Sequence, residues 1–415
     1  MDDDLTTVNV DTEIQEILLA ATNHDIPKLR ELIRLHENSS SSTLGNPVNV
    51  KDPETGFAPL HAAIAACEED DDDHEEEEEE GEEEPNATNG MMANGDNNHA
   101  NGDSREGNCQ SSVSAVRFLL GEGAIWNDLD LNDETPGCIA RRIGATELYD
   151  VMVDAGVRAE LLLNRLEGYE QLEDDDEDED EAENQHTEAH TTEAPSSTEN
   201  NAHYLSSYLT FQPDRLLDQD HNGVMMSWER DIMNQTARKL LPTPGLRVLN
   251  IGHGMGIVDS ALQSLSPSCH YIVEAHPAVV DEMRRTGWLD KPGVHVRQGR
   301  WQDVLPALCT EGVTFDAIYY DTFAESYADF RSFFDEMVIG LLEETGRWSF
   351  FNGMGADRQI SYDVYQKVVE MDLFEAGFDV EWEDLSVAQL EGEWQGVRPY
   401  WAVQSYRLPL CKFMD

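Results

Sequence analysis

Two acidic residues in this chain occur where a carboxylate could hold a cation. Glu229 stands next to Trp228, and a carboxylate beside an indole is a good site for a planar, delocalised cation such as a guanidinium. The apolar residues around Glu229 are equally typical of a plain packing helix. Asp321 follows the apolar run 317–320, so that an acid emerges from the end of a predicted strand. Both acids are candidates for chemistry on a bound ligand.

A glycine-rich turn is the second feature with chemical potential. The apolar run 248–251 leads into Gly252, Gly254 and Gly256, and a helix is predicted directly after them. Alternating glycines let the backbone approach a ligand closely, and the start of a helix offers unpaired N–H groups. The next predicted strand ends in Glu274, at roughly the ~20-residue spacing at which an acid reaches the ribose of a nucleotide cofactor. Turn and acid together predict a nucleotide-like cofactor.

The third predicted strand end distinguishes between two cofactors. It carries Trp301 and Gln302, which would place an aromatic face beside an adenine-sized slot. A nicotinamide-dependent dehydrogenase would more often show G-x-G-x-x-G, whereas this chain has G-x-G-x-G followed by Ile257. S-adenosylmethionine fits better, because its neutral adenosine needs a ribose clamp and a flat apolar slot, and it has no pyrophosphate to bind.

Alternating strands and helices position these residues. Their order predicts a mostly parallel sheet covered on both faces, with ligands bound at the carboxyl ends of the strands. Two last strands complete a seven-stranded, Rossmann-like sheet, the final one as an antiparallel insertion. Strands are predicted at 247–251, 271–274, 294–298, 317–321, 348–352, 380–382 and 400–406, and helices at 257–264, 277–286, 327–342 and 360–371.

The N-terminal part of the chain shows a helical repeat pattern. Residues 13–35 read as a helix pair, and Thr55 to Ala63 resembles the T-P-L-H-x-A start of an ankyrin repeat, with a weaker copy at Glu134. The prolines of the two copies, Pro59 and Pro136, lie more than two ~33-residue periods apart. We therefore predict a disordered insertion inside one repeat, after which a helix resumes.

These patterns divide the chain into three parts. Residues 1–165 are predicted to form a small all-α, ankyrin-like module with a disordered acidic insertion at 68–112 and a helix resuming at 114–120; a generic helical domain is the alternative. Residues 166–203 are predicted to be an acidic disordered linker. Residues 204–415 form the predicted cofactor-binding domain.

Composition restricts the partners of this chain. It has 85 acidic and 27 basic residues, a formal net charge of −58, so we expect a basic protein partner and no direct binding to nucleic acid. The six scattered cysteines indicate neither a zinc site nor a disulfide framework. We find no signal segment and no apolar run of the ~18 residues that a membrane-spanning helix needs. We expect a soluble monomer in the cytoplasm and nucleus, without membrane association.

Taken in order, the motifs resemble one family. The chain is similar to the fungal arginine N-methyltransferase 2 family, the type IV protein arginine methyltransferases, which are themselves similar to guanidinoacetate methyltransferase. The resemblance implies a class I methyltransferase sheet, an ankyrin-like N-terminal region and S-adenosylmethionine as cofactor. It further implies methylation of the internal δ-nitrogen of an arginine, with ribosomal proteins of the large subunit as substrates. It rests on the runs 225–229, 249–256, 274–277, 299–302, 320–323 and 351–353.

The resemblance also assigns roles to single residues. Glu229 and Asp321 would grip the guanidinium as the catalytic pair. The turn from Gly252 to Ile257 would hold the methionine part of the cofactor. His253 departs from the family pattern, which has an aromatic residue there, so its role is left open. The full set of expected cofactor contacts is Tyr208, Met233, Gly252, His253, Gly254, Met255, Gly256, Ile257, Glu274, Ala275, His276, Trp301, Gln302 and Asp321, with Glu274 and His276 at the ribose and Trp301 and Gln302 at the adenine.

Elementary chemistry then suggests a mechanism. A guanidinium has a pKa above ~12 and therefore no free lone pair at neutral pH. Two carboxylates can localise its charge on the outer nitrogens, and Asp321 in a dry site can take the proton as the inner nitrogen reacts. A small-molecule guanidino methyltransferase is the alternative enzyme, and an acidic adaptor for basic proteins is the non-enzymatic alternative.

Overall fold

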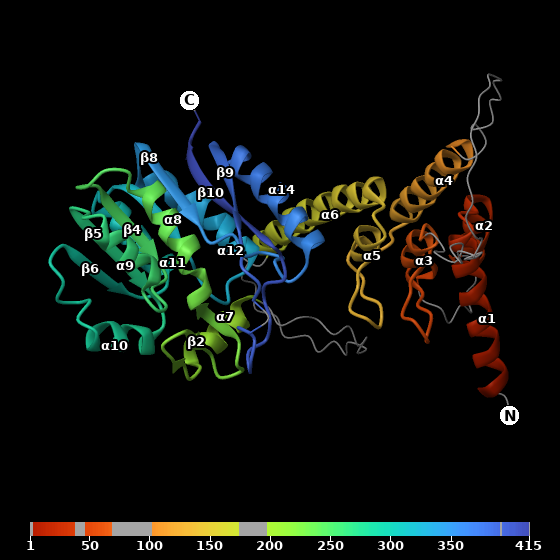
Figure 1. Cartoon of the computed structure of the whole chain (residues 1–415), viewed down its shortest axis with the longest axis horizontal. Coiled ribbons are helices and arrows are strands. Elements are labelled where there is room, and N and C mark those ends of the chain that lie inside the picture. The colour runs from red at the N-terminus through yellow and green to blue at the C-terminus, as the bar shows by residue number, and fades with distance from the viewer. Residues whose placement is uncertain (1–2, 38–45, 69–101, 174–196, 391, 415) are drawn as a thin grey trace, which may run out of the picture. The chain divides into compact units, whose positions relative to one another are not determined.

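The computed structural model describes residues 3–37, 46–68, 102–173, 197–390 and 392–414 (Figure 1). The chain divides into two compact units, Met1–Ala159 and Glu160–Asp415, and each is described by itself. The boundary between them falls inside helix α6 (Thr146–Glu173). In the described residues, no helix combines the length and the apolar character needed to cross a membrane.

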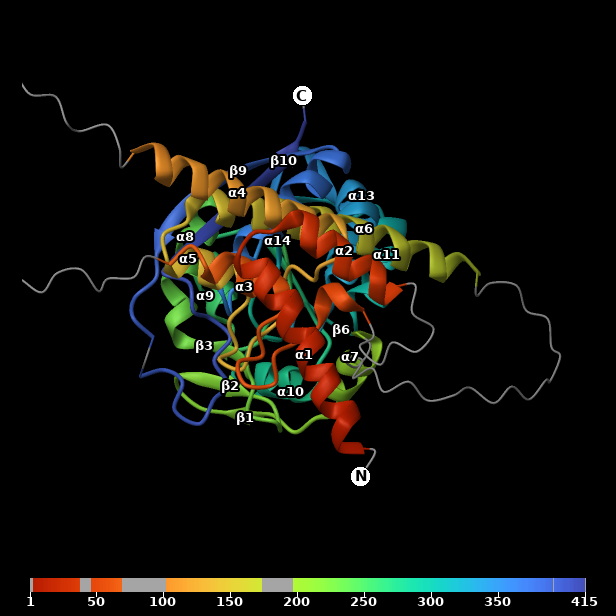
Figure 2. The ribbon, with the colours of Figure 1, turned by 90° about the vertical axis from the view of Figure 1, so that its right-hand side faces the viewer.

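The first unit is helical. It contains α1 (Asp3–Thr22), α2 (Ile26–Glu37), a short 3-10 helix (Pro47–Asn49), α3 (Pro59–Ala65), α4 (Gly102–Gly121), α5 (Pro136–Arg142) and the start of α6. Helix α1 packs on α2 and α3, and α3 packs on α4 and α5 (Figure 2). The predicted helix pair at 13–35 is confirmed, and the helix predicted at 114–120 is the end of α4.

The two T-P-L-H-like segments lie side by side in this unit. Helices α3 and α5 both begin with a proline in their first turn. The loops before them are joined, because the Leu131 N–H donates to the Thr55 carbonyl at 3.0 Å and His61 Nε2 lies 3.3 Å from the Glu134 carbonyl. Thr135 caps α5 by accepting the Cys138 N–H at 3.2 Å. Adjoining helix starts are expected of neighbouring repeats; the ankyrin identity stays a prediction.

The two acidic segments predicted to be disordered fall mainly outside the described residues. Of the insertion 68–112, residues 69–101 are not described, and α4 begins at Gly102. Of the linker 166–203, residues 174–196 are not described. Residues 166–173 belong to α6, and residues 197–203 belong to α7 (Ser197–Ser206).

The second unit is built on a seven-stranded sheet. Its order is β6-β5-β4-β7-β8-β10-β9, and β10 runs antiparallel to both of its neighbours, as predicted. The strand order reverses at β4, between β5 and β7, which makes the carboxyl ends of β4 and β7 the expected ligand site. The strands are β4 (Arg247–Ile251), β5 (Cys269–Glu274), β6 (Val294–Gln298), β7 (Phe315–Tyr320), β8 (Leu342–Phe350), β9 (Phe378–Ser386) and β10 (Ser405–Phe413).

Side-chain alternation along the central strands divides the core into two layers. Val248 of β4 packs toward α8 (Arg230–Leu240), α9 (Ile257–Ser264) and α10 (Pro277–Arg285). The next residue, Leu249, packs on the other face with α11 (Trp301–Thr310), α12 (Tyr327–Ser332), a π-helix (Phe333–Val338) and α14 (Gln359–Glu375). Such burial of both faces explains why the central strands read as continuous apolar runs.

The predicted elements need correction at the last strand, at α8 and at α11. The last strand was expected at 400–406 but is Ser405–Phe413, because Tyr400 and Trp401 belong to the loop before it. Pro409 lies inside this strand, an unusual place for a residue without an N–H, and it obscures the strand pattern. Helix α11 was not predicted, and the packing helix that was one alternative around Glu229 is α8, which begins only at Arg230. Residues 301–303 were interpreted as a turn, but Trp301 begins α11.

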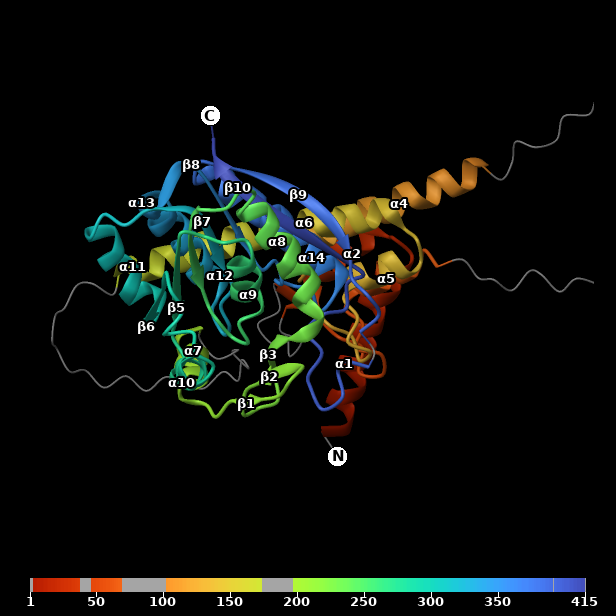
Figure 3. The same ribbon diagram turned by 60° about the vertical axis from the view of Figure 1, so that its left-hand side comes forward.

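A small sheet and helix α7 complete the second unit. Strands β1 (Thr210–Phe211), β2 (Arg215–Leu217) and β3 (Gly223–Met226) form an antiparallel sheet, followed by a 3-10 helix (Ser227–Glu229). Figure 3 shows α7 and this sheet at the end of the unit where β5 leads into α10, which is the carboxyl end of the parallel strands. They therefore cover the expected ligand site.

Candidate active site

Two cavities meet at the carboxyl end of β7. The smaller, with a volume of about 60 Å³, runs along the glycine turn and is lined by Gly252, Gly254, Glu274, Ala275 and Trp301, among others. The larger, of about 510 Å³, contains both candidate catalytic acids. Val224, Asp321, Thr322, Phe323 and Glu325 line both cavities. The fold thus brings the predicted cofactor turn and the predicted cation site into contact.

Glu229 is a buried acid at one side of the larger cavity, at the end of the short 3-10 helix before α8. Its carboxylate accepts the Tyr400 hydroxyl and, at 3.4 Å, the Met226 N–H. Burial, together with the negative charge of Asp321, raises the pKa of Glu229 to about 8 in spite of these hydrogen bonds. Glu229 is therefore poised to gain or lose a proton near neutral pH.

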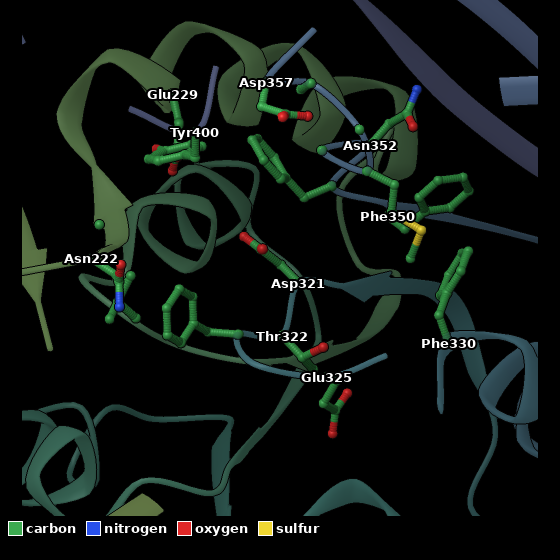
Figure 4. A pocket seen from close by; sticks show the side chains of 18 of the residues that line it. Asn222, Glu229, Asp321, Thr322, Glu325, Phe330, Phe350, Asn352, Asp357 and Tyr400 are labelled. Carbon is green, nitrogen blue, oxygen red and sulfur yellow. The ribbon is translucent and has the colours of Figure 1, made fainter. Parts of the chain in front are cut away.

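Asp321 stands between the two cavities, immediately after β7. Its carboxylate points toward the side on which Glu229 and Tyr400 lie (Figure 4). The Oδ2 atom is buried and has no hydrogen-bond partner among the described residues. Burial, followed by the charges of Asp259 and Glu274, raises the pKa of Asp321 to about 7. A buried acceptor without a donor is unusual, and it is suited to a ligand that supplies the donor.

The fold itself requires glycine at two positions of the turn, whether or not a ligand is bound. Gly252 has a φ of 92°, and a Cβ there would lie 1.8 Å from the backbone oxygen of Asp321. At Gly256, with a φ of 69°, a Cβ would lie 2.7 Å from the ring of His253. Side chains at these positions would collide with fixed neighbours. The contact at Gly252 places the turn directly beside the strand end that carries Asp321.

Glu274 organises the backbone of the turn. Its buried carboxylate accepts the His253 N–H at 2.8 Å, the Gly254 N–H at 3.4 Å and the His276 N–H at 2.7 Å. It also lines the smaller cavity, as predicted for a ribose clamp. His276 caps α10 and contacts Tyr204 of α7, but it does not line either cavity. The structure therefore places Glu274 at the cavity, as expected, whereas His276, also expected at the ribose, lies outside the lining because its ring caps α10 and packs on Tyr204.

Trp301 and Gln302 are held by an acid that the sequence analysis did not single out. Both Glu325 oxygens lie within 3.1 Å of Trp301 Nε1, and Gln302 Nε2 donates to Glu325 at 3.4 Å. Tyr320 completes the cluster, because its hydroxyl donates to Glu325 at 2.5 Å. Trp301 lines the smaller cavity, whereas Gln302 does not.

The side chain of His253, whose role was left open, turns away from the cavities. Its Nδ1 lies 2.6 Å from Asp259, and His270 Nε2 lies 2.9 Å from the other Asp259 oxygen. Burial alone would raise the pKa of Asp259, but hydrogen bonds and charge from the two histidines lower it to about 2. His253 therefore anchors the turn to α9 through its side chain, while its backbone N–H binds Glu274.

Several predicted cofactor contacts do not reach the cavities. Tyr208 is 83% exposed, and Met233 is fully buried in the core between α8 and the sheet. Met255, Gly256 and Ile257 also lie outside both linings. Met255, Gly256 and Ile257 form the end of the turn and the start of α9, but the described structure brings none of the five residues into a cavity lining.

Two tyrosines of the site were missed. Tyr204 of α7 lines the smaller cavity and packs on His276 and Phe323 with ring centroids 4.9 Å apart in each pair. Tyr400 lines the larger cavity and donates to Glu229. Tyr204 is the first residue of the predicted cofactor-binding domain, ahead of any predicted strand, and Tyr400 lies in the predicted last strand. Only tertiary structure connects either of them with the acids.

Comparison with known proteins identifies relatives of this architecture. The family model described as guanidinoacetate N-methyltransferase matches residues 198–403, which include both cavities. Among solved structures, a precorrin-6y C5,15-methyltransferase from Geobacter metallireducens is similar over 44% of this chain and 88% of that chain, with 16% identity and a TM-score of 0.32. A likeness at this level carries no argument about function.

Full-length relatives are much more similar. Protein arginine N-methyltransferase 2 from Aspergillus oryzae is 62% identical over 100% of both chains, and the protein of the same name from Aspergillus fumigatus is 61% identical over 98% of both. The Neurospora crassa protein of this name is 38% identical over 97% of this chain and 96% of its own. These matches confirm the resemblance drawn from the motifs: the chain belongs to the protein arginine N-methyltransferase 2 family.

Proposed function

We propose that this chain is an S-adenosylmethionine-dependent, type IV methyltransferase that methylates the internal δ-nitrogen of an arginine in a basic protein. The observation that carries the proposal is the carboxylate pair Glu229 and Asp321. Both acids face one cavity, both have raised pKa values, and Asp321 also borders the glycine turn. Membership of the arginine N-methyltransferase 2 family supports the same activity.

The chemical groups of the smaller cavity fit S-adenosylmethionine. Glu274 offers carboxylate oxygens to a ribose diol, and the indole of Trp301 offers an apolar face to an adenine. The volume of about 60 Å³ is far below the roughly 300 Å³ of ordinary ligand sites. Binding therefore requires the cover formed by Tyr204 and Phe323 to move outward. When bound, the cofactor supplies an electrophilic methyl group on a sulfonium.

The larger cavity favours a cationic guanidino group. Two buried carboxyls near each other resist ionisation, and a guanidinium between them supplies the positive charge that both lack. The bound cation lowers the pKa of Glu229 and of Asp321, so that both ionise and form charge-assisted hydrogen bonds with it. The Oδ2 atom of Asp321, which has no partner among the described residues, is the natural acceptor.

The same pair prepares the substrate for reaction. With the outer nitrogens bound to carboxylates, the positive charge is localised there and the inner nitrogen regains nucleophilic character. Asp321 then accepts the proton that a guanidinium must lose, and general-base catalysis of this kind contributes roughly 10²–10⁴-fold. The hydroxyl of Tyr400 holds Glu229 in place during the transfer.

The overall charge supports a basic protein as substrate. A net charge of −58 attracts a cationic partner over a distance limited by the Debye length, about 8 Å at physiological salt. We propose a protein of the large ribosomal subunit in the cytoplasm or nucleus. We also propose that the helical pairs of the first unit form an ankyrin-like stack, for which partner binding is the usual use.

A small guanidino acid is the second candidate substrate, since the matching family model is that of guanidinoacetate N-methyltransferase. Such a substrate carries a carboxylate that needs a cationic or N–H partner. Among the described lining residues of the larger cavity, Arg398 is the one basic side chain, and it is exposed at the rim. Four acids, Glu229, Asp321, Glu325 and Asp357, line the same cavity and favour a substrate without a carboxylate.

Mass spectrometry separates the candidates. The full chain is incubated with methyl-labelled S-adenosylmethionine together with either ribosomal proteins or guanidinoacetate, and the products are hydrolysed to amino acids. We expect labelled δ-monomethylarginine in protein, and none with Asp321→Asn. Label on a terminal nitrogen would contradict the type IV assignment. Label on the free guanidino acid alone would favour a small-molecule guanidino methyltransferase. If no methyl group were transferred to either substrate, the non-enzymatic acidic adaptor would be the remaining hypothesis.

A further inference from the structure

The larger cavity has more space than a guanidino group needs. Its volume of about 510 Å³ lies within the range of sites for whole drug-sized ligands, roughly 300–1,000 Å³. The carboxylates occupy only one side of it. In Figure 4, Asp321 stands in the middle, Glu229 lies on one side, and Phe330 and Phe350 lie on the opposite side.

The side opposite Glu229 is apolar. Phe330 comes from α12, Phe350 from the end of β8 and Val369 from α14, and all three are at most 3% exposed. Met354, from the loop after β8, lines the cavity beside them and is partly exposed. These four residues, Phe330, Phe350, Met354 and Val369, are called the apolar end. It is continuous with the carboxylate pair and belongs to one cavity with it.

Apart from Glu229 and Asp321, the described charged lining residues of the larger cavity offer no free buried group. Glu325 accepts from Trp301, Tyr320 and Gln302, so its oxygens are occupied on the side of the smaller cavity. Arg398, the one basic residue among the described lining residues, is exposed. A charged or strongly polar group in the apolar end would therefore lose its hydration without a buried partner. The occupant must be uncharged and apolar.

We propose that the apolar end is a subsite for an apolar side chain of the substrate protein, one that flanks the arginine to be methylated. The proposal rests on the proposed function and specifies its substrate: an arginine with a leucine, methionine or phenylalanine nearby in the chain. The guanidinium enters between the carboxylates while the neighbouring apolar side chain enters between Phe330 and Phe350. One cavity thus binds the two side chains together.

The expected size of the effect follows from apolar burial. Complete burial of a leucine-sized side chain increases binding by about 10- to 100-fold relative to leaving it exposed. Alanine at the same position fills little of the space. The ratio of kcat/KM between a leucine-flanked and an alanine-flanked arginine peptide should fall in this range, at one flanking position.

The test compares peptide series on the full chain. Arginine peptides with alanine elsewhere receive a single leucine at each nearby position in turn, and kcat/KM is measured for each. Met354→Gln keeps the side-chain length but makes the apolar end polar, and Val369→Phe fills it. Met371→Gln is the matched control, because Met371 is 47% exposed on α14 and lies outside the cavity lining. The ratio of kcat/KM between two peptides measured on the same enzyme preparation does not depend on the fraction of folded protein.

We expect one position with a leucine preference of about 10-fold or more in the unmodified chain and in Met371→Gln. The preference should fall to a few-fold or less in Met354→Gln and in Val369→Phe. Equal rates for all peptides would overturn the proposal while leaving arginine methylation intact. A uniform loss for both peptides in Met354→Gln would also overturn it, because the apolar end would then hold the stem of the arginine itself. Absence of methylation from every arginine substrate would instead refute the proposed function.

Discussion

Replacement of Glu229 by glutamine should stabilise the protein at alkaline pH while abolishing its activity. The pKa of the Glu229 carboxyl rises from 4.5 to about 8 on folding. The folded state therefore binds this proton more tightly than the unfolded state, and the chain loses stability as pH rises from about 4.5 to about 8. Above that range the full cost of the buried charge is present. Glutamine carries no charge, so the variant avoids this cost.

The magnitude follows from the shift. Each pKa unit corresponds to 1.36 kcal/mol, so a shift of this size corresponds to roughly 5 kcal/mol at most. Because Asp321 shares the coupling, part of this cost disappears only when both acids are neutral, and we expect a net gain of about 2–3 kcal/mol from the glutamine alone. For a unit of this size, the melting temperature should rise by roughly 5–10 °C at pH 8.5.

Differential scanning calorimetry at pH 5 and pH 8.5 checks this reasoning. At pH 5 the two proteins should melt at nearly the same temperature, and at pH 8.5 the variant should melt higher. Asp357→Asn is the matched control, because Asp357 lines the same cavity but is exposed and pairs with Arg358 at 3.0 Å. A melting difference that is the same at both pH values would refute the claim that a buried charge at Glu229 opposes folding.

Three further outcomes are expected. Asp321→Asn should keep cofactor affinity, measured by calorimetry, but lower single-turnover methyl transfer by roughly 10²–10⁴-fold, and full activity would exclude Asp321 as the base. Glu274→Ala should raise the cofactor dissociation constant, because the N–H groups of His253, Gly254 and His276 lose their acceptor and the ribose loses its clamp; an unchanged constant would remove Glu274 from the site. Tyr400→Phe removes a hydrogen bond that lowers the pKa of Glu229, so this pKa should rise. The pH above which KM for an arginine peptide falls should therefore be higher in the variant, and an unchanged pH dependence of KM would contradict this.

The sequence alone predicted the parallel sheet and the two acids that directly follow or end its strands. Apolar runs with short helices between them determine a parallel sheet, and residues directly after such strands must lie at one edge. Glu274 and Asp321 were found in this way. The exact strand β10 was not, because Pro409 interrupts its pattern and aromatic residues of the preceding loop imitate a strand.

Local sequence patterns could not predict the site residues that are connected to the acids only by tertiary contacts. Tyr204, Tyr400 and Glu325 each act through a tertiary contact, and nothing in their immediate neighbours distinguishes them from surface or core residues. The role of His253 was hidden for a related reason. Its partner Asp259 lies in the first turn of α9, where an acid is ordinarily a solvated helix-start residue.

The contact between Gly252 and the backbone of Asp321 has a mechanical consequence. A Cβ at Gly252 would lie 1.8 Å from the Asp321 carbonyl oxygen, and the Asp321 N–H donates to the Ile251 carbonyl at 2.9 Å, so the turn and the strand end are in direct main-chain contact. Any displacement of the turn on cofactor binding must carry Asp321 with it. Cofactor binding in the smaller cavity is therefore coupled, through the main chain, to the position of the Asp321 carboxylate in the larger cavity.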